Sequence, residues 1–139
     1  MGASRPTATG CGIGALARHE EVATSSLILE RVPLVAEAMP HVAVRNRGTF
    51  GGSIALADPT AELSACALAL GAAVVVQNVR ARRAIAAVDY FRGLYETGRA
   101  PDELLVEVQI PVQSRSCVSV FELAPRRGDF RDRWGCVPA

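Results

Sequence analysis

The chain has 139 residues, of which 50% are apolar and 5% aromatic, and its formal net charge is +1. This composition excludes a disordered protein, and a nearly balanced charge without long runs of one sign gives no reason to expect a nucleic-acid or membrane-surface partner. No apolar stretch reaches the ~18 residues of a membrane span, and residues 1–10 lack the apolar core of a signal peptide, so we expect a cytoplasmic protein.

The first part of the chain is predicted to be mainly helical. Residues 1–11 are rich in Gly, Ser, Thr and Pro and indicate an irregular N-terminal tail, and residues 12–17 predict a short strand. Residues 18–39 have a helical pattern in two or three pieces, because Ser25 can cap a second piece and Pro33 suits the first turn of another. We predict a helical hairpin with the core-facing residues Val22, Leu27, Ile28, Leu34, Val35 and Ala38.

The rest of the chain carries a further helix and most of the strands. The helical pattern of residues 61–70 is followed by Gly71, which suits a C-cap, and residues 89–97 predict a short helix or turn. Strand patterns cover residues 72–79, 84–88, 104–110 and 117–123. The third of these alternates well, with apolar residues at Leu104, Val106, Val108 and Ile110, and ends at Pro111. Helices followed by an antiparallel meander of strands indicate an α+β fold.

The cysteines and histidines form no metal or nucleophile motif. The four cysteines are Cys11, Cys66, Cys117 and Cys136. None stands in a C-x-x-C pair, so their spacing argues against zinc and iron–sulfur sites and favours buried, reduced thiols. His19 and His41 are far apart, and we expect both to be structural.

A polar, glycine-rich loop in the middle of the chain leads into an apolar helix. Gly48, Gly51 and Gly52 allow positive φ values and a close approach of a ligand to the backbone, and Thr49 and Ser53 supply hydroxyl groups. Successive backbone N–H groups before a helix form an anion site, for which a pyrophosphate is the natural guest. A purely structural Gly-Gly turn is the alternative, because the loop has neither the G-x-G-x-x-G spacing of a dinucleotide fold nor the Lys of a P-loop.

This loop and its surroundings resemble a known family. The segment RNRGTFGGSIALADPTAEL, residues 45–63, is similar to the second FAD-binding signature of molybdenum hydroxylase flavoprotein subunits, the carbon monoxide dehydrogenase medium-subunit and xanthine dehydrogenase family. Further matches follow the family's order: GIGALARHEEV (12–22), DYFRGLYETGRAPDELLVEVQIP (89–111) and FELAPRRGDF (121–130). The resemblance implies the second subdomain of the PCMH-type FAD-binding fold.

The resemblance also implies a domain division. Residues 12–112 would be a partial FAD-binding domain, and residues 113–139 a truncated start of the C-terminal flavoprotein subdomain. The family's first FAD subdomain, with its A-G-G-x-S/T phosphate loop, is expected to be missing. After Phe130 the sequence departs from the family pattern, which we interpret as a frameshift.

Residues that contact FAD are implied by the same matches. Pyrophosphate and ribityl contacts fall on Thr49, Gly51, Gly52 and Ser53. Glu62 corresponds to a carboxylate at the adenosine ribose, Leu105 to an apolar residue beside the adenine, and Phe130 to an aromatic residue near the isoalloxazine ring.

Three further positions have two interpretations each. Asp58 is similar to an acidic residue near the cofactor, and could equally cap the helix expected from Pro59. Arg45 and Asn46 could orient the glycine-rich loop, or be a solvated arginine and a turn asparagine.

These matches predict an FAD-binding electron-transfer component of a molybdenum-containing hydroxylase or dehydrogenase. It would pass electrons from the iron–sulfur clusters of a 2Fe-2S small subunit to an external acceptor, in a complex that also holds a molybdopterin-binding large subunit. No residue of the chain is predicted to be catalytic, because the flavin supplies the chemistry. The alternative is a truncated, cofactor-free remnant or docking module of such a subunit.

Overall fold

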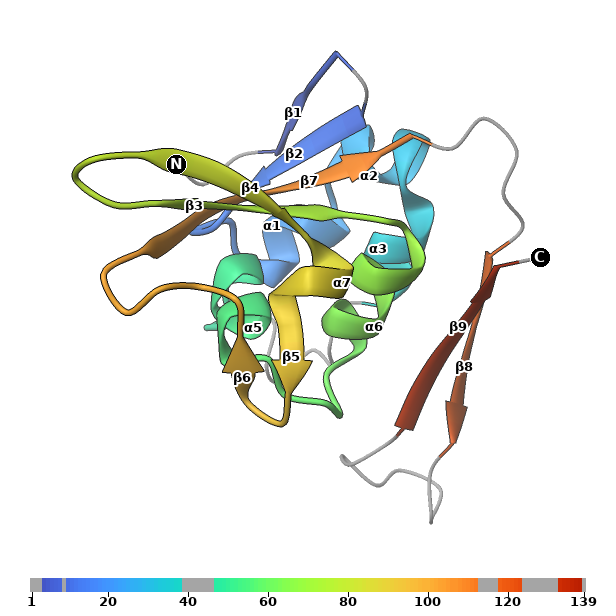
Figure 1. Cartoon of the computed structure of the whole chain (residues 1–139). Helices are drawn as coiled ribbons and strands as arrows, with labels where there is room; N and C mark the ends of the chain where they lie inside the picture. The colour runs from blue at the N-terminus through green and yellow to red at the C-terminus, as the bar shows by residue number, and fades with distance from the viewer. Residues whose placement is uncertain (1–3, 9, 39–46, 113–117, 124–132, 139) are drawn as a thin grey trace.

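A five-stranded sheet and a layer of short helices on one of its faces form the body of the chain (Figure 1). The computed structural model describes residues 4–8, 10–38, 47–112, 118–123 and 133–138, the last two ranges as backbone. Every neighbouring pair of strands in the five-stranded sheet is antiparallel. Its order is β1 (Ser4–Pro6), β2 (Gly10–Gly14), β7 (Leu104–Pro111), β3 (Ala73–Gln77) and β4 (Arg82–Ala86). The predicted α+β fold is confirmed.

The helices are short, and the predicted helical region near the N-terminus consists of separate pieces. The described helices are α1 (His19–Ala23), α2 (Ser26–Arg31), α3 (Pro33–Glu37), α5 (Phe50–Leu56), α6 (Glu62–Ala69) and α7 (Ala87–Tyr90). Two small hairpins pair β5 (Phe91–Gly93) with β6 (Glu96–Thr97) and β8 (Val118–Leu123) with β9 (Arg133–Pro138). None of the described helices combines the length and apolar character that crossing a bilayer requires.

The N-terminal segment differs from its prediction as an irregular tail. β1 occupies part of it, and Ser4 pairs with Ile13 and Pro6 with Cys11 in the adjoining β2. Proline is tolerated here because β1 is an edge strand, where one missing N–H donor leaves no gap in the ladder. The polar composition of residues 1–11 gave no sign of this pairing, since β2 is held in place by β7, a strand about a hundred residues later.

The strand order also departs from the predicted meander, because the last strand of the sheet lies at its centre. β7 pairs with β2 on one side, where Cys11 faces Ile110, and with β3 on the other, where Val74 faces Val108. A local alternation pattern identifies β7 as a strand but carries no information about its neighbours.

A β-bulge changes which residues of β7 face the core. Val75 of β3 pairs with Glu107, but the next residue, Val76, pairs with Leu105. The extra residue shifts the alternation, so that Leu105 packs against the core. Leu104 is consequently 72% exposed, although it belongs to the alternating apolar pattern.

The core lies between the sheet and the helices. Val22, Ile28, Leu34, Val35 and Ala38 are buried as predicted, and Leu27 packs against them. The three consecutive valines of β3 are all buried, as expected for a central strand. Gly71 has a φ of +62° after α6, which confirms the predicted C-cap. Of the cysteines, Cys11 and Cys66 are buried free thiols, and the side chains of Cys117 and Cys136 lie outside the described residues.

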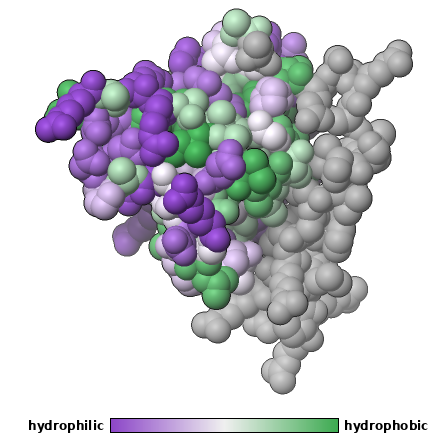
Figure 2. Space-filling view, in the orientation of Figure 1, coloured by the Kyte–Doolittle hydropathy of each residue, from purple (hydrophilic) through white to green (hydrophobic). Residues whose placement is uncertain are grey.

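Exposed polar side chains cover the end of the molecule formed by the β3–β4 hairpin (Figure 2). Arg80, Arg82 and Arg83 come from this hairpin, and all three are exposed. Arg82 and Arg83 both make ion pairs with glutamates of the β7 segment. The polar end of the sheet is thus held together by paired charges.

Candidate functional site

The glycine-rich loop lies against the connection between β2 and α1. Arg18 and Thr49 form an isolated antiparallel bridge. On either side of it, backbone N–H groups donate from His19 to Gly48 O (3.2 Å), from Phe50 to Ala17 O (2.9 Å) and from Gly51 to Ala15 O (3.0 Å). The start of α5 is therefore fixed on a second segment that lies more than thirty residues earlier in the chain.

The two adjacent glycines serve different purposes. A Cβ atom at Gly51 would lie 2.6 Å from both Cα and Cβ of Ala15, so only glycine lets the two backbones approach this closely. Gly52 is exposed, and among the described residues a Cβ there would meet Thr49 Oγ1, a side-chain atom, at 2.8 Å. Gly51 is thus a packing residue, whereas the lack of a side chain at Gly52 lets the Thr49 hydroxyl lie close to its backbone.

The backbone amides at the start of α5 are already engaged inside the chain. The N–H of Phe50 and that of Gly51 donate to the β2–α1 connection, and the N–H of Ser53 donates to Thr49 O at 3.1 Å. The N–H of Gly52 donates to Thr49 Oγ1, also at 3.1 Å. These four amides therefore have acceptors within the chain, and the anion site that the sequence predicts from them stays a prediction.

Two hydroxyl groups are further candidate donors at this position. Thr49 Oγ1 accepts the Gly52 amide, which leaves its own proton available to a ligand. Ser53 Oγ lies 3.1 Å from Nε2 of His19. Because Thr49 and Ser53 are four residues apart, their side chains share one side of the helix with Gly52 between them. The three residues form a small surface, the hydroxyl patch, which places two hydroxyl groups beside a residue without a side chain.

The remaining predicted residues are spread over other elements. Asp58 Oδ1 accepts hydrogen bonds from the backbone N (2.9 Å) and the hydroxyl (2.7 Å) of Thr60, so one carboxylate oxygen is used in the turn before α6. Glu62 is the first residue of α6 and is partly exposed, and the helix begins there rather than at Pro59. Leu105 lies on β7 opposite Val76.

The structure therefore brings together only part of the predicted set. Thr49, Gly52 and Ser53 form the hydroxyl patch, and the adjacent Gly51 packs against Ala15. α5 contacts β7, the strand that carries Leu105. Arg45, Asn46 and Phe130 lie outside the described residues.

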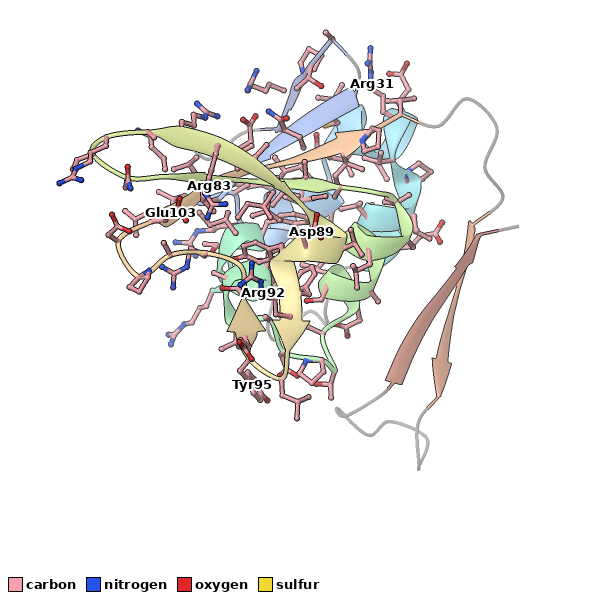
Figure 3. All side chains as sticks on the ribbon, viewed as in Figure 1. Arg31, Arg83, Asp89, Arg92, Tyr95 and Glu103 are labelled. Carbon is pink, nitrogen blue, oxygen red and sulfur yellow. The ribbon has the colours of Figure 1, made fainter. Side chains whose placement is uncertain are left out.

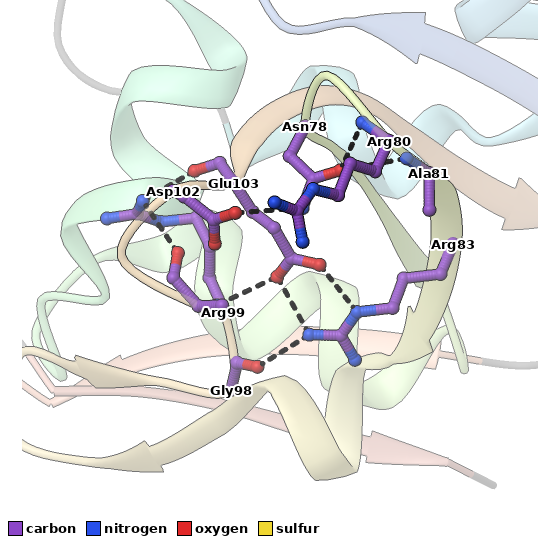
Figure 4. A network of polar contacts seen from close by, with 9 residues as sticks. Asn78, Arg80, Ala81, Arg83, Gly98, Arg99, Asp102 and Glu103 are labelled. Atoms are coloured by element: carbon purple, nitrogen blue, oxygen red, sulfur yellow. Dashed lines mark hydrogen bonds and ion pairs between the residues drawn. The ribbon is translucent and has the colours of Figure 1, made fainter.

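A charged network fixes the segment that enters β7 (Figure 4). Glu103 accepts from Arg83 Nε at 2.7 Å and Arg83 Nη2 at 2.8 Å, and from the Ala100 amide at 2.8 Å. Arg99 donates to the backbone oxygen of Glu103 at 2.6 Å. The hydrogen bonds from Arg83 and then from Ala100 lower the pKa of Glu103 from 4.5 to about 2. In Figure 3 the Arg83 and Glu103 side chains meet between β4 and this segment.

Two contributors to the site were missed in the sequence. His19 was expected to be structural, but its imidazole contacts a residue of the hydroxyl patch. Ala15 supplies the backbone surface that makes Gly51 necessary. The sequence around His19 and Ala15 contains no motif that marks either residue, because both act through contacts with a segment far away in the chain.

Comparison with known proteins defines the class to which this fold and site belong. Residues 1–113 match the family model described as "FAD binding domain in molybdopterin dehydrogenase". The chain belongs to this family, whose cofactor is FAD, and its relatives are medium subunits of molybdenum hydroxylases. The predicted family resemblance is confirmed.

Individual relatives agree with this assignment. The chain is 37% identical over 123 residues to the caffeine dehydrogenase subunit beta of Pseudomonas sp. (strain CBB1), covering 85% of this chain and 42% of that protein. It is 34% identical over 129 residues to the carbon monoxide dehydrogenase medium chain of Hydrogenophaga pseudoflava, covering 90% and 45%. The chain thus spans less than half the length of these relatives.

Solved structures match the fold. Carbon monoxide dehydrogenase from Hydrogenophaga pseudoflava, in a form lacking the Mo-pyranopterin moiety, has a TM-score of 0.85 at 31% identity, covering 92% of this chain and 46% of that one. Quinoline 2-oxidoreductase from Pseudomonas putida 86 has the same TM-score at 33% identity, with the same coverage. The agreement places the antiparallel sheet and its helices in the fold of these flavoprotein subunits.

Proposed function

We propose that this chain binds FAD and serves as the electron-transfer component of a molybdenum-containing hydroxylase or dehydrogenase. In this role it passes electrons from the iron–sulfur clusters of a 2Fe-2S small subunit to an external acceptor, beside a molybdopterin-binding large subunit. The observation that carries the proposal is the FAD-binding family match over residues 1–113, in which the hydroxyl patch lies.

The residues of the patch fit a phosphate group. Gly52 has no side chain to cover the Thr49 hydroxyl, whose oxygen would lie 2.8 Å from a Cβ at that position. The Thr49 proton is free to donate because a backbone amide already occupies one lone pair of the oxygen. We assign the pyrophosphate to Thr49, Gly52 and Ser53, with Gly51 as the packing residue beneath them.

The other predicted contacts are assigned by the same family correspondence. Glu62 is proposed to meet the adenosine ribose, Leu105 the adenine and Phe130 the isoalloxazine ring. Asp58 keeps one carboxylate oxygen in its turn and has a second one for a ligand. Arg45 and Asn46 are proposed to orient the loop before the patch.

FAD, when bound, supplies the redox chemistry, so the chain needs no catalytic side chain. The protein's tasks are to hold the pyrophosphate and to fix the position of the flavin ring. A hydrogen bond to a charged phosphate contributes about 1.5–3 kcal/mol. Two hydroxyl donors would therefore strengthen binding about 10²-fold or more.

The test is a titration of the purified chain with FAD, followed by flavin fluorescence. We expect saturable binding with a micromolar or tighter Kd. The matched variant is Gly52→Asp, which places a carboxylate beside the Thr49 hydroxyl and repels the pyrophosphate. It should weaken binding by at least about tenfold, while far-UV circular dichroism stays unchanged. Failure of the unmodified chain to bind FAD would favour the cofactor-free docking module instead.

Electron transfer is tested separately on the FAD-loaded chain. Mixing it with a reduced 2Fe-2S protein in a stopped-flow instrument should bleach the flavin absorbance. An unchanged flavin spectrum would contradict the electron-transfer role and leave FAD binding standing.

A further inference from the structure

His19 is a buried histidine whose side chain reaches the hydroxyl patch. It is 1% exposed, and its Nε2 atom lies 3.1 Å from Ser53 Oγ across thirty-four residues of sequence. Its backbone N–H also donates to Gly48 O. His19 therefore contacts one residue before the start of α5, Gly48, and one within α5, Ser53. Among the described residues, His19 is one of four buried polar or charged ones.

The direction of the His19–Ser53 hydrogen bond decides what Ser53 can offer a ligand. A serine hydroxyl has one proton and two acceptor lone pairs. If Ser53 donates to an unprotonated Nε2, its proton is consumed inside the protein and only lone pairs face outward, which repel an anion. If Nε2 carries the proton and donates to Ser53, the hydroxyl proton is free for a phosphate oxygen.

We infer that His19 is a positioning residue, whose Nε2–H donates to Ser53 Oγ and thereby directs the Ser53 proton at the bound anion. The inference rests on the proposed function, because it concerns the pyrophosphate assigned to the same patch. Thr49 has the same arrangement, in which a protein donor occupies the oxygen and leaves the hydroxyl proton to the ligand. The amides of Phe50 to Ser53 are engaged inside the chain, so the orientation of these two hydroxyls matters for anion affinity.

Mutations separate this role from a purely structural one. His19→Leu removes the donor and Ser53→Ala removes the hydroxyl, and each should raise the Kd for FAD about tenfold. Because His19 acts through Ser53, the double variant should bind no more weakly than Ser53→Ala alone. His19→Gln, whose side-chain amide can donate from nearly the same place as Nε2, should restore most of the affinity.

The matched structural control is Val22→Ala on the same helix. Val22 is also 1% exposed, and its truncation should lower the thermal unfolding temperature while leaving the Kd for FAD unchanged. If His19→Leu does not fold, the comparison of Ser53→Ala with His19→Gln still tests the inference. Loss of affinity in Ser53→Ala with retention in His19→Gln supports it, and full affinity in Ser53→Ala overturns it.

A spectroscopic measurement reads the hydrogen-bond direction itself. The chain has only two histidines, so the ¹⁵N imidazole signals of the FAD complex are few, and His19→Gln assigns them. We expect a proton on Nε2 of His19 in the complex, and an unprotonated Nε2 would overturn the inference while FAD binding stands. Absence of FAD binding by the unmodified chain would overturn the proposed function and this inference together.

Discussion

Gly51 and Gly52 are adjacent in sequence, but the structure gives them opposite sensitivities. Gly51 faces the Ala15 backbone at a distance that no Cβ atom tolerates, whereas the atom that a Cβ at Gly52 would meet among the described residues is the side-chain oxygen Thr49 Oγ1, at 2.8 Å. With the proposed FAD contact at Gly52, we expect stability to depend mainly on Gly51 and ligand binding on Gly52.

This separation predicts the behaviour of two alanine variants. Gly51→Ala should lower the free energy of unfolding by about 1–3 kcal/mol, because backbone atoms must move to admit the methyl group. Gly52→Ala should change stability by less than about 1 kcal/mol, because the strain at Thr49 is offset by better helix propensity, yet it should weaken FAD binding. Denaturant unfolding and FAD titration of both variants check this, and equal losses of stability would contradict it.

At the scale of single elements, Glu107 on β7 ties the two edge strands of the sheet to its centre. Its carboxylate pairs with Arg5 of β1 at 2.6 Å and with Arg82 of β4 at 2.8 Å. The Glu107 side chain is 6% exposed, whereas the arginines are 58% and 52% exposed. Gly12 of the intervening β2 has no side chain, which leaves room for the carboxylate above that strand.

Glu107→Gln tests this link across the sheet. The variant keeps the shape but removes the charge that both arginines share, and we expect a loss of about 1–2 kcal/mol of unfolding free energy, because solvent already screens the exposed arginines. The matched control is Glu37→Gln on the exposed side of α3, which should be neutral. Denaturant titration gives both values, and equal stability of the two variants would refute the link.

The Glu103 network predicts a dependence of stability on pH. Its pKa is lowered from 4.5 to about 2 in the folded chain, chiefly by Arg83. A carboxyl with a lowered folded-state pKa stabilises the fold above its unfolded pKa, and this contribution disappears as the pH falls from about 4.5 towards 2. The gap in melting temperature between the unmodified chain and Glu103→Gln should therefore narrow over this range. Thermal melts at several pH values measure the gap, and a constant gap would show that Glu103 contributes no linkage.

At the scale of the whole molecule, the central position of β7 makes the fold depend on contacts between distant segments. β2 and β3 are both held by β7 and do not pair with each other. A chain that lacks β7 would therefore split the sheet into two separate hairpins, β1–β2 and β3–β4, each of which is marginal in water.

Truncation tests this dependence. A chain ending at residue 103 should be largely unfolded, with poor dispersion in its ¹H–¹⁵N spectrum, because the central strand is absent. A chain ending at residue 112 retains the whole five-stranded sheet and should give a dispersed spectrum. A folded spectrum from the shorter chain would show that the two hairpins do not need β7.

The sequence by itself determined the family, the α+β class and the elements with strong local patterns. The three valines of β3, the Gly71 cap and the buried apolar residues of α1 to α3 follow from periodicity and glycine chemistry, which act between near neighbours. Only the tertiary structure decided the central place of β7, the bulge that exposes Leu104, and the use of the loop amides inside the chain. It also brought His19 to Ser53. The physical reason is common to these features: each depends on a backbone or side-chain partner far away in the chain, which local pattern does not encode.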